Sequence, residues 1–283
     1  MKIQAVGIIG QGFVGGALAE CFSPHYKVHT YDKMREDLST HKSIFDLSKA
    51  CELVFVCVPT PMKEDGSCDI SIVEDVVKQA CSTGRRNIIA IKSTIPPNTT
   101  KHLQDLCQDS DIVFNPEFLL ERQADDDFKN TTRVILGGPR PATTRLKQFY
   151  SKIFPRADII KTDSTIAEMV KYLTNSFLAV KVSFANEIYN ICNSLSIDYD
   201  KVIEYSLYDE RLGQSHWSVP GPDGHYGFGG SCFPKDLNAL MHLAQTLCIK
   251  ANTINGAWNT NLMARPEKDW ELLKGRAVVS NDK

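Results

Sequence analysis

A glycine-rich turn near the start of the chain constrains the fold more than any other feature. The apolar stretch AVGIIG, from Ala5, is typical of a buried strand, and GQGFVG, from Gly10 to Gly15, follows it directly and opens a helix. Gly10 permits the tight turn, Gly12 lets the backbone approach a pyrophosphate, and Gly15 allows the helix to pack closely on the strand. The helix N-terminus then offers unpaired N–H groups to the phosphates, so the sequence predicts a dinucleotide site.

An acidic residue stands at the spacing that such a site requires. Asp32 ends the second predicted strand, about 20 residues beyond the glycines, where a carboxylate binds a ribose 2′-hydroxyl. Because a carboxylate repels a 2′-phosphate, NAD is predicted rather than NADP, although Lys33 and Arg35 place positive charge nearby. A chance glycine cluster is the alternative, and it leaves the strand, the helix and Asp32 unexplained. The further residues expected to contact the cofactor are Phe13, Val14, Lys33 and Thr60, the last of which also fits an ordinary proline-stiffened turn.

Short β-branched runs alternate with helical patterns such as ISIVEDVVKQACSTG in the first half of the chain. The runs lack polar alternation, as expected when helices cover both faces of a sheet. This alternation predicts an α/β fold with a doubly wound parallel sheet of the Rossmann type. The candidate strands are AVGIIG from Ala5, KVHTY from Lys27, LVFVCVP from Leu53, NIIAIKST from Asn87, DIVFNP from Asp111 and RVILGG from Arg133.

The pattern changes near Ser164. A stretch without Gly or Pro, STIAEMVKYLTNSFLAVKVSFANEIYNICNSL, predicts one long helix, and shorter helical segments follow it. We therefore expect an all-helical domain with a long central helix after the Rossmann domain. The expected bounds are 1–163 for the NAD-binding domain, 164–263 for the helical dimerisation and catalytic domain, and 264–283 for a tail.

Composition narrows the class of protein. The 283 residues are 42% hydrophobic and 23% charged, an ordinary globular balance. A net charge of -2 gives no broad electrostatic attraction to nucleic acid or anionic membrane. Nine cysteines without C-x-x-C spacing predict reduced thiols in a cytoplasmic protein and no zinc site, and no apolar run is long enough to span a bilayer.

One cysteine stands apart from the others. Cys232 lies in YGFGGSCFPKD, where a glycine-rich backbone allows a ligand to come close and a helix is predicted to begin at Pro234. A helix N-terminus and Lys235 both favour the thiolate, and the N–H groups of Gly229 and Gly230 are candidate donors to an oxyanion. The sequence therefore predicts a covalent nucleophile. Cys68 lies in a polar loop, and the remaining cysteines are expected to be small buried hydrophobes: Cys21, Cys51, Cys57, Cys81, Cys107, Cys192 and Cys248.

Polar side chains gather at the long helix and at strand ends. Lys171 and Asn175 are four apart on the helix, so they share a face, with Glu168 one turn earlier. A solvated helix stripe is the alternative, but Asn175 sits among apolar neighbours, where it would need a partner. Strand ends supply Glu117 and Glu121 in NPEFLLE, and Ser93 and Thr94 in KSTIPPNTT, where helix capping by Thr99 or Thr100 is the plainer interpretation.

These motifs together resemble a known family. GQGFVG, KSTIPPNTT, NPEFLLE, AEMVKYLTNSFLAVKVSFANE and GFGGSCFPKD, in this order, look like the UDP-glucose 6-dehydrogenase family, which includes GDP-mannose dehydrogenase. The resemblance covers nearly the whole chain, and the last motif is very specific. It implies oxidation of a sugar C6 alcohol to a carboxylate with two NAD+ and one water, with UDP-glucose as the leading substrate.

The resemblance also implies roles for residues. Cys232 would attack the C6 aldehyde, giving a thiohemiacetal and then a thioester that water hydrolyses. Lys171 and Asp236 would handle the first deprotonation through a water, and Asn175 would position the sugar. The remaining implied roles are the catalytic water for Thr94, acid–base chemistry and substrate contact for Glu117, the nicotinamide and hydrolytic water for Glu121, and substrate contact for Phe118, Leu119 and Gly229. Arg211 would reach the substrate of a neighbouring subunit in a homodimer built on the long helix.

The chain departs from the family pattern in places. Family members continue into a second α/β domain over the nucleotide, whereas this chain ends soon after WELLKGRAVVSNDK, so a short form without the uridine-side pocket is expected. The loop GQSHWSVPGPDGHY is longer than in many relatives and would replace part of that wall. Arg122 stands where relatives often carry glycine.

Two other functions compete with this interpretation. A two-electron β-hydroxyacid dehydrogenase also combines a Rossmann domain, a long helix and a Lys-x-x-x-Asn pair, but it needs no thiol. A non-catalytic NAD-binding regulatory subunit would explain a short C-terminus, yet every candidate catalytic residue is present. UDP-glucose and GDP-mannose are not separated by these motifs.

Overall fold

The structure is a computed structural model that describes residues 3–119 and 128–280. The chain divides into two compact units. Unit 1 comprises Met1–Thr60 and Ile70–Lys171, and unit 2 comprises Pro61–Asp69 and Tyr172–Lys283. The division falls inside the long helix α7 (Ser164–Ser194), which the sequence predicted as one uninterrupted element.

Unit 1 is built on a 7-stranded sheet in the order β2-β1-β3-β4-β5-β6-β7. Every predicted strand is present; most are short apolar runs that the sheet buries, whereas β2 (KVHTY) stays partly exposed. The bounds are β1 (Ala5–Ile9), β2 (Lys27–Tyr31), β3 (Leu53–Val56), β4 (Ile88–Ile91), β5 (Asp111–Phe114), β6 (Arg133–Gly137) and β7 (Asp158–Thr162).

Two features of the sheet differ from the prediction. The pair β5–β6 is antiparallel through Phe114 and Gly137, so the sheet is mostly rather than wholly parallel. Strand β7 was not predicted. It pairs in parallel with β6 at the edge of the sheet, and its residues Asp158–Thr162 stay largely exposed, so the run lacks the continuous apolar character of a buried strand.

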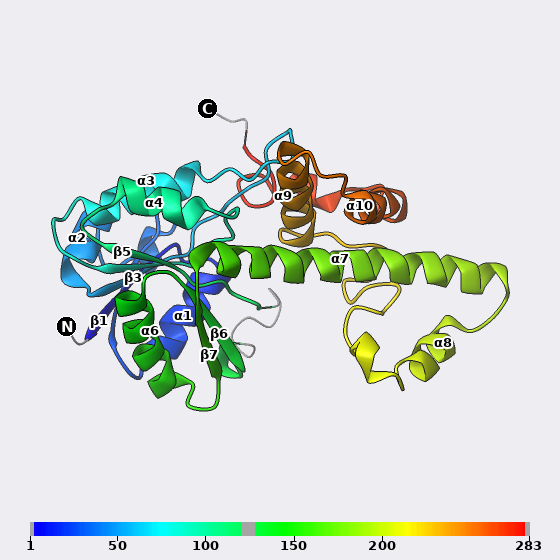
Figure 1. The fold of residues 1–283 in the computed structure, drawn as a ribbon, viewed down its shortest axis with the longest axis horizontal. Helices are drawn as coiled ribbons and strands as arrows, with labels where there is room; N and C mark the ends of the chain where they lie inside the picture. Colours follow the sequence, from blue (N-terminus) through cyan, green and yellow to red (C-terminus); the bar gives the residue numbers. More distant parts are fainter. Residues whose placement is uncertain (1–2, 120–127, 281–283) are drawn as a thin grey trace. The chain divides into compact units, whose positions relative to one another are not determined.

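Helices cover both faces of the sheet (Figure 1). One face packs against α1 (Phe13–Phe22) and α6 (Arg140–Ile153), with Phe22, Phe149 and Tyr150 in its core. The other face packs against α2 (Ile44–Ala50), α3 (Ser71–Cys81) and α4 (Thr99–Leu106), with apolar residues such as Leu47, Val77 and Leu103 between helix and sheet. A short 3-10 helix, η1 (Glu36–Leu38), follows β2.

The order of the strands fixes where a ligand can bind in unit 1. From β1 the chain moves outward to β2 and then returns to the other side of β1 as β3. In open α/β sheets the crevice at such a reversal, beyond the carboxyl ends of the strands, is the binding position. The glycine turn follows β1 and therefore lies at this point.

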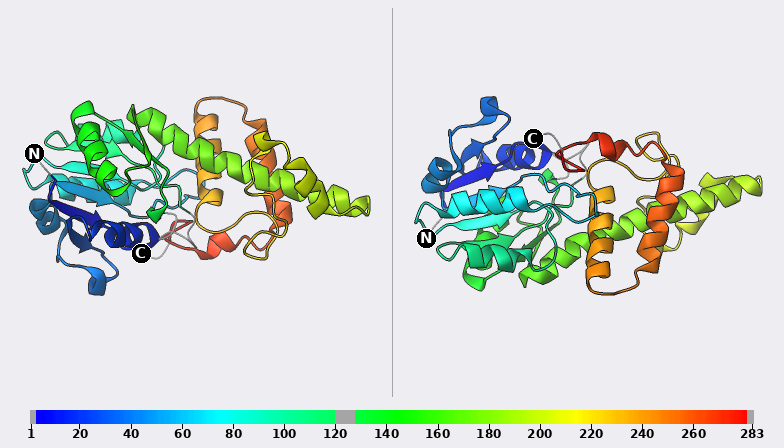
Figure 2. Two further views of the ribbon diagram at one scale, coloured as in Figure 1. Left: turned by 90° about the horizontal axis from the view of Figure 1, so that it is seen from below. Right: turned by 90° about the horizontal axis from the view of Figure 1, so that it is seen from above.

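Unit 2 is helical, as predicted. Besides the second part of α7, it contains α8 (Tyr199–Ser206), η3 (Glu210–Leu212), α9 (Phe233–Thr246), α10 (Asn252–Ala264) and η4 (Asp269–Leu272). The helices α9 and α10 lie side by side (Figure 2), and Leu237 of α9 packs with Ala179 of α7, Phe228 and Trp258 of α10. In the described ranges no helix is both long enough and apolar enough to cross a bilayer.

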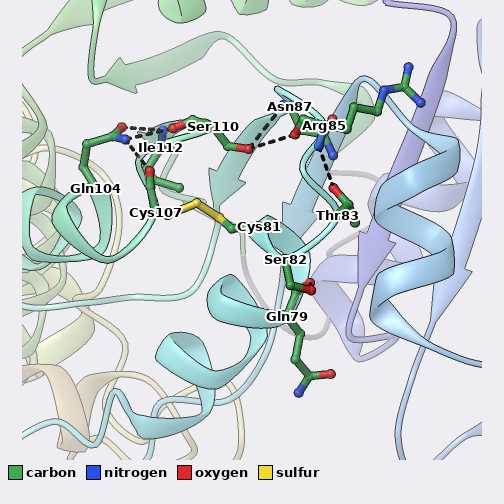
Figure 3. The surroundings of a disulfide bond; sticks show 10 residues. All are labelled: Gln79, Cys81, Ser82, Thr83, Arg85, Asn87, Gln104, Cys107, Ser110 and Ile112. Atoms are coloured by element: carbon green, nitrogen blue, oxygen red, sulfur yellow. Dashed lines mark hydrogen bonds between the residues drawn. A yellow bond between two sulfur atoms is a disulfide. The ribbon is translucent and has the colours of Figure 1, made fainter.

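The cysteines correct two expectations from the sequence. Cys81, the last residue of α3, and Cys107, which follows α4, form a disulfide with 6.0 Å between their Cα atoms (Figure 3). The prediction that all thiols are reduced is therefore wrong for this pair. Cys248, which follows the end of α9 and has a left-handed φ of 56°, is exposed rather than buried. Cys51 and Cys192 are buried as expected, whereas Cys21 and Cys57 are only half-buried.

Candidate active site

The glycine turn of unit 1 has the geometry of a phosphate-binding loop. Gly10 has a φ of +91°, and a Cβ on it would lie 2.5 Å from the carbonyl oxygen of Cys57, so only glycine fits. A Cβ on Gly15 would collide with the carbonyl oxygen of Gly10. Gly12 is the N-cap of α1, and open space lies where its side chain would be. A pyrophosphate therefore has room beside the first N–H groups of α1.

Asp32 is tied to this turn by its carboxylate. Its Oδ2 accepts from the N–H of Gln11 at 2.7 Å, and its Oδ1 accepts from the N–H groups of Met34 and Arg35 at 2.8 and 3.0 Å. A carboxylate offers about four lone-pair sites, so it keeps capacity for a ribose hydroxyl. Lys33, beside it, is exposed.

The remaining predicted cofactor residues lie near this turn in sequence or at strand ends. Phe13 and Val14 form the start of α1 and pack against the core while staying partly accessible. Thr60 follows β3 and is buried. The glycine turn, the start of α1 and Asp32 fit a dinucleotide, with backbone N–H groups for phosphate and a carboxylate for ribose.

A buried ion pair lies at the carboxyl end of the sheet in unit 1. The Nζ atom of Lys171 donates to the Oε1 atom of Glu117 at 3.0 Å and to the backbone carbonyl of Glu117 at 2.6 Å. Burial works against ionisation, yet Lys171, the N–H of Leu119 and Lys92 lower the pKa of Glu117 below its usual value. The sequence did not predict this pairing, since the two residues are 54 positions apart.

Lys92 is a functional candidate that the sequence analysis missed. It directly follows β4, is 4% exposed, and its Nζ donates to the carbonyl of Pro116 at 3.3 Å. Burial lowers the pKa of Lys92 to about 8, despite the negative charge of Glu117. The signal was available in KSTIPP, where a lysine interrupts an apolar run at a strand end. Burial also raises the pKa of the Cys57 thiol to about 12, so Cys57 is not an activated nucleophile.

The strand end after β4 holds two further predicted residues. Ser93 donates through its hydroxyl to the carbonyl of Val58 at 2.7 Å and so joins the ends of β4 and β3. Thr94, the next residue in the chain, is also buried. This places Thr94 at the edge where Lys92 and Glu117 lie, since β4 and β5 are parallel neighbours.

Helix capping is arranged differently from the sequence prediction. Asn98, in a left-handed conformation, is the N-cap of α4, not Thr99 or Thr100. The carboxylate of Glu168 accepts from the N–H of Asn98 at 2.7 Å and from the N–H and hydroxyl of Thr100 at 2.7 and 2.6 Å. Glu168 is therefore a buried structural cap rather than part of a solvated helix stripe.

The segment after Glu117 is described only in part. Phe118 lies under the Lys171 ammonium, 5.4 Å from the ring centroid, and under the Arg133 guanidinium at 4.2 Å. Leu119 is half-buried. Glu121 and Arg122 lie outside the described residues.

In unit 2 a buried carboxylate links α7 and α9. The amide of Asn175 donates to the Oδ2 atom of Asp236 at 2.6 Å, and Lys235 forms an ion pair with the Oδ1 atom. Asn175 and Asp236 are 7% and 1% exposed, so the partner expected for Asn175 is this carboxylate.

Cys232 stands at the N-terminus of α9. It is the N-cap residue, and its carbonyl accepts the N–H of Asp236 at 3.0 Å. Burial alone would lower the pKa of Lys235, but Asp236 and the sulfur atoms of Cys232 and Cys68 raise it above the usual value. Cys232 is half-buried, and a thiolate at this position gains both from the helix N-terminus and from Lys235.

One of the two proposed oxyanion donors, Gly230, needs a correction. The N–H of Gly230 donates to the Oδ2 atom of Asp269 at 3.0 Å, so it is already engaged. Gly229 lies against Asp269 and Arg265. Arg211, on η3, has an 89% exposed side chain that pairs with Asp209.

Comparison with known families decides the class of protein. Residues 27–156 match the NAD binding domain of the UDP-glucose/GDP-mannose dehydrogenase family, and residues 165–262 match the central domain of the same family. The chain belongs to the UDP-glucose/GDP-mannose dehydrogenase family. Unit 1 is thus an NAD-binding domain, and the family's central domain begins with α7.

Curated relatives agree with this family. UDP-glucose 6-dehydrogenase TuaD of Bacillus subtilis is 29% identical over 98% of this chain and 68% of its own length. The UDP-glucose 6-dehydrogenase of Rickettsia bellii is 33% identical over 75% of this chain and 50% of its own length. The chain thus spans half to about two thirds of these relatives, and what they do as whole proteins is a proposal for this chain.

Solved structures show the same fold. A UDP-glucose dehydrogenase from Pyrobaculum islandicum superposes with a TM-score of 0.83 at 27% identity, covering 96% of this chain and 70% of the other. A 3-hydroxyisobutyrate dehydrogenase from Mycobacterium tuberculosis has a TM-score of 0.76 at 16% identity over 95% of both chains, which shows a shared fold alone.

Proposed function

We propose that this protein catalyses the NAD-dependent four-electron oxidation of the C6 alcohol of a nucleotide sugar to the carboxylate, with UDP-glucose as substrate. The observation that carries the proposal is Cys232 at the N-terminus of α9, beside Lys235. A two-electron dehydrogenase has no use for such a thiol, whereas a second oxidation needs a group that retains the aldehyde.

Cys232 performs the covalent chemistry in this proposal. After the alcohol has lost a proton and a hydride, the thiolate adds to the aldehyde carbon, and the oxygen takes a proton to give a thiohemiacetal. Loss of a second hydride and of that proton gives a thioester, and water then displaces the thiolate and leaves a carboxylate. NAD+, when bound, accepts the hydride in each oxidation. The covalent bond prevents the aldehyde from escaping between the two steps.

Neighbouring residues handle protons and position the sugar. Lys171 and Asp236 act through a water on the proton of the C6 hydroxyl, and Asn175 holds the sugar. Lys171 and Asn175 are four residues apart on α7, so they share one face of this helix. Thr94 holds the hydrolytic water. Glu117 and Glu121 are proposed to assist its attack, and Phe118, Leu119 and Gly229 to line the sugar.

A homodimer belongs to the proposal. Large apolar side chains on α7 are exposed, including Leu173, Phe177, Phe184 and Ile191. Their spacing follows a heptad-like stripe, which suits pairing with the same helix of a second copy. In that dimer the exposed Arg211 contacts the substrate of the partner subunit. The proposal places the reaction in the cytoplasm. This compartment keeps most thiols reduced, so the Cys81–Cys107 disulfide is unusual for it.

The yield of NADH per sugar tests the proposal. The purified protein is incubated with NAD+ and limiting amounts of UDP-glucose, GDP-mannose or UDP-N-acetylmannosamine, and NADH is followed by absorbance until it stops rising. We expect UDP-glucose to give two NADH per sugar consumed, with UDP-glucuronate as product. A β-hydroxyacid dehydrogenase would instead give one NADH with a β-hydroxyacid and none with any sugar. NAD binding without product from any sugar would favour the regulatory subunit.

A further inference from the structure

The backbone that leads to Cys232 is held by two buried asparagines of unit 2. Asn186 on α7 accepts from the N–H of Gly227 at 3.1 Å. Asn261 on α10 accepts from the N–H of Phe228 at 2.7 Å and donates to the carbonyl of Phe228 at 3.0 Å. The loop therefore has little conformational freedom at its first two positions.

The next two residues, Gly229 and Gly230, are held by the charged side chains of Asp269 and Arg265. Asp269, on η4, accepts from the N–H of Gly230 at 3.0 Å and pairs with the Nε atom of Arg265 at 2.6 Å. Arg265 is only 3% exposed and also pairs through Nη1 with Asp223 at 2.8 Å. Charge-assisted hydrogen bonds of this kind are about twice as strong as neutral ones. One buried guanidinium thus joins η4, the loop before Gly227 and the end of α10.

The Arg265–Asp269 ion pair, called the clamp below, contacts the backbone of the loop that leads to Cys232 (residues 227–231). A Cβ on Gly229 would collide with the Oδ1 atom of Asp269 and would lie 2.5 Å from the Arg265 guanidinium carbon. Gly230 adds a φ of +70° that favours glycine. Arg265 and Asp269 therefore pack closely against Gly229 and Gly230, the two residues before Ser231 and Cys232. All of these residues belong to unit 2.

We infer that Arg265 and Asp269 are positioning residues, which fix the Gly229–Gly230 backbone so that Cys232 stays at the N-terminus of α9 with its sulfur beside Lys235. For catalysis this inference rests on the proposed function, because it assigns the clamp to the covalent step. The placement of the thiol is a separate claim that needs no substrate.

The placement has a chemical consequence. Within the described part of unit 2, the charged groups near Cys232 in the structure include Lys235 and Asp236 on α9 and the Arg265–Asp269 pair, which contacts Gly229 and Gly230. The N–H groups of the first turn of α9 and the Lys235 ammonium favour the thiolate only while the sulfur stays near them. If the loop is released, Cys232 is expected to behave as an ordinary thiol.

Alkylation of Cys232 tests the inference. Iodoacetamide labelling of the full chain is followed by peptide mass spectrometry from pH 5 to pH 10, with the exposed Cys248 as a reference thiol in the same molecule. In the unchanged protein we expect the pH midpoint for Cys232 to lie below that for Cys248. In Asp269→Ala and Arg265→Ala we expect the Cys232 midpoint to rise by about one unit or more, with the Cys248 midpoint unchanged.

Milder variants and a control separate positioning from loss of fold. Asp269→Asn keeps an acceptor for the Gly230 N–H, and Arg265→Lys keeps one ion pair, so each is expected to move the midpoint less than the alanine change. Glu271→Ala, two residues beyond Asp269 and exposed, is expected to change nothing. Turnover of nucleotide sugar in Asp269→Ala is expected to fall roughly ten- to a hundredfold with NAD affinity retained.

The outcomes distinguish the two proposals. A midpoint that stays in place in both Asp269→Asn and Asp269→Ala, with unchanged circular dichroism, overturns the positioning role. Equal midpoints for Cys232 and Cys248 in the unchanged protein overturn it as well. If the midpoint moves while no nucleotide sugar is oxidised by any form, the clamp is upheld and the proposed function fails.

Discussion

Single buried charges determine what the carboxyl edge of the sheet in unit 1 can do. Glu117 has Lys171 within 3.0 Å, and Lys92 contributes a second positive charge that lowers the pKa of Glu117. A buried carboxylate with two cations stays ionised at neutral pH, which suits a group that is to accept a proton or bind a hydroxyl. The desolvation penalty falls on Lys92, whose buried ammonium donates to the carbonyl of Pro116.

The desolvation of the buried Lys92 ammonium predicts that the stability of the protein depends on pH. Burial lowers its pKa from 10.5 to about 8, so below pH 8 both folded and unfolded chains carry the proton and the full penalty of about 3 kcal/mol is present. As pH rises from 8 to 10.5 the folded chain releases its proton first, and the penalty disappears. The free energy of unfolding of the unchanged protein, relative to Lys92→Met, should therefore rise with pH by up to about 3 kcal/mol.

Urea unfolding at several pH values between 6.5 and 10.5 measures this difference. The exposed Lys33→Met is the matched control and should show a flat difference over the same range. If the difference in free energy of unfolding between the unchanged protein and Lys92→Met does not change with pH, Lys92 is not a buried, charged lysine.

At the scale of elements, local sequence patterns were enough to predict most strands and helices. Contacts between residues far apart in the sequence could not be predicted in this way. The buried strands were predictable because each is a continuous apolar run, whereas β7 is an exposed edge strand without that pattern. The cap of α4 comes from Glu168, 68 positions away in sequence from Thr100, and no local signal marks it. Cys232 at the start of α9 was predictable from Gly and Pro around it, but the Arg265–Asp269 clamp was not.

The disulfide predicts a second stability effect. Cys81 and Cys107 join the ends of α3 and α4 across a sequence separation of 26. Closing a loop of that length restricts the unfolded chain and stabilises the fold by about 3 kcal/mol. Reductant should therefore lower the free energy of unfolding of unit 1 by about this amount.

Urea unfolding with and without dithiothreitol is the measurement, and Cys81→Ser is the control that should be insensitive to reductant. Identical curves for the unchanged protein under both conditions would show that the two thiols are not bonded in solution.

At the scale of the whole molecule, the proposed homodimer rests on the exposed apolar stripe on α7. Leu173, Phe177 and Ile191 are 62%, 64% and 53% exposed, which is unusual for large apolar side chains on one helix. We expect Phe177→Asp to convert a dimer into a monomer, because it places a charge in the centre of a buried apolar seam.

Sedimentation velocity of both forms at micromolar concentration checks this. Phe45→Asp, on α2 and 42% exposed, is the control and should leave the dimer intact. A monomer in the unchanged protein would contradict the stripe's role, as would a Phe177→Asp protein that still sediments as a dimer.

The whole catalytic account depends on the sulfur of one residue, and its removal is the most direct measurement. The rate of NADH formation from UDP-glucose and NAD+ is compared for the unchanged protein, Cys232→Ala and Cys248→Ala, each checked for NAD binding and for thermal unfolding. The account predicts that Cys232→Ala loses roughly a thousandfold or more of the second-step rate while still binding NAD, and that Cys248→Ala is unaffected. A Cys232→Ala protein that still yields two NADH per sugar at a rate within tenfold of the unchanged protein would contradict it.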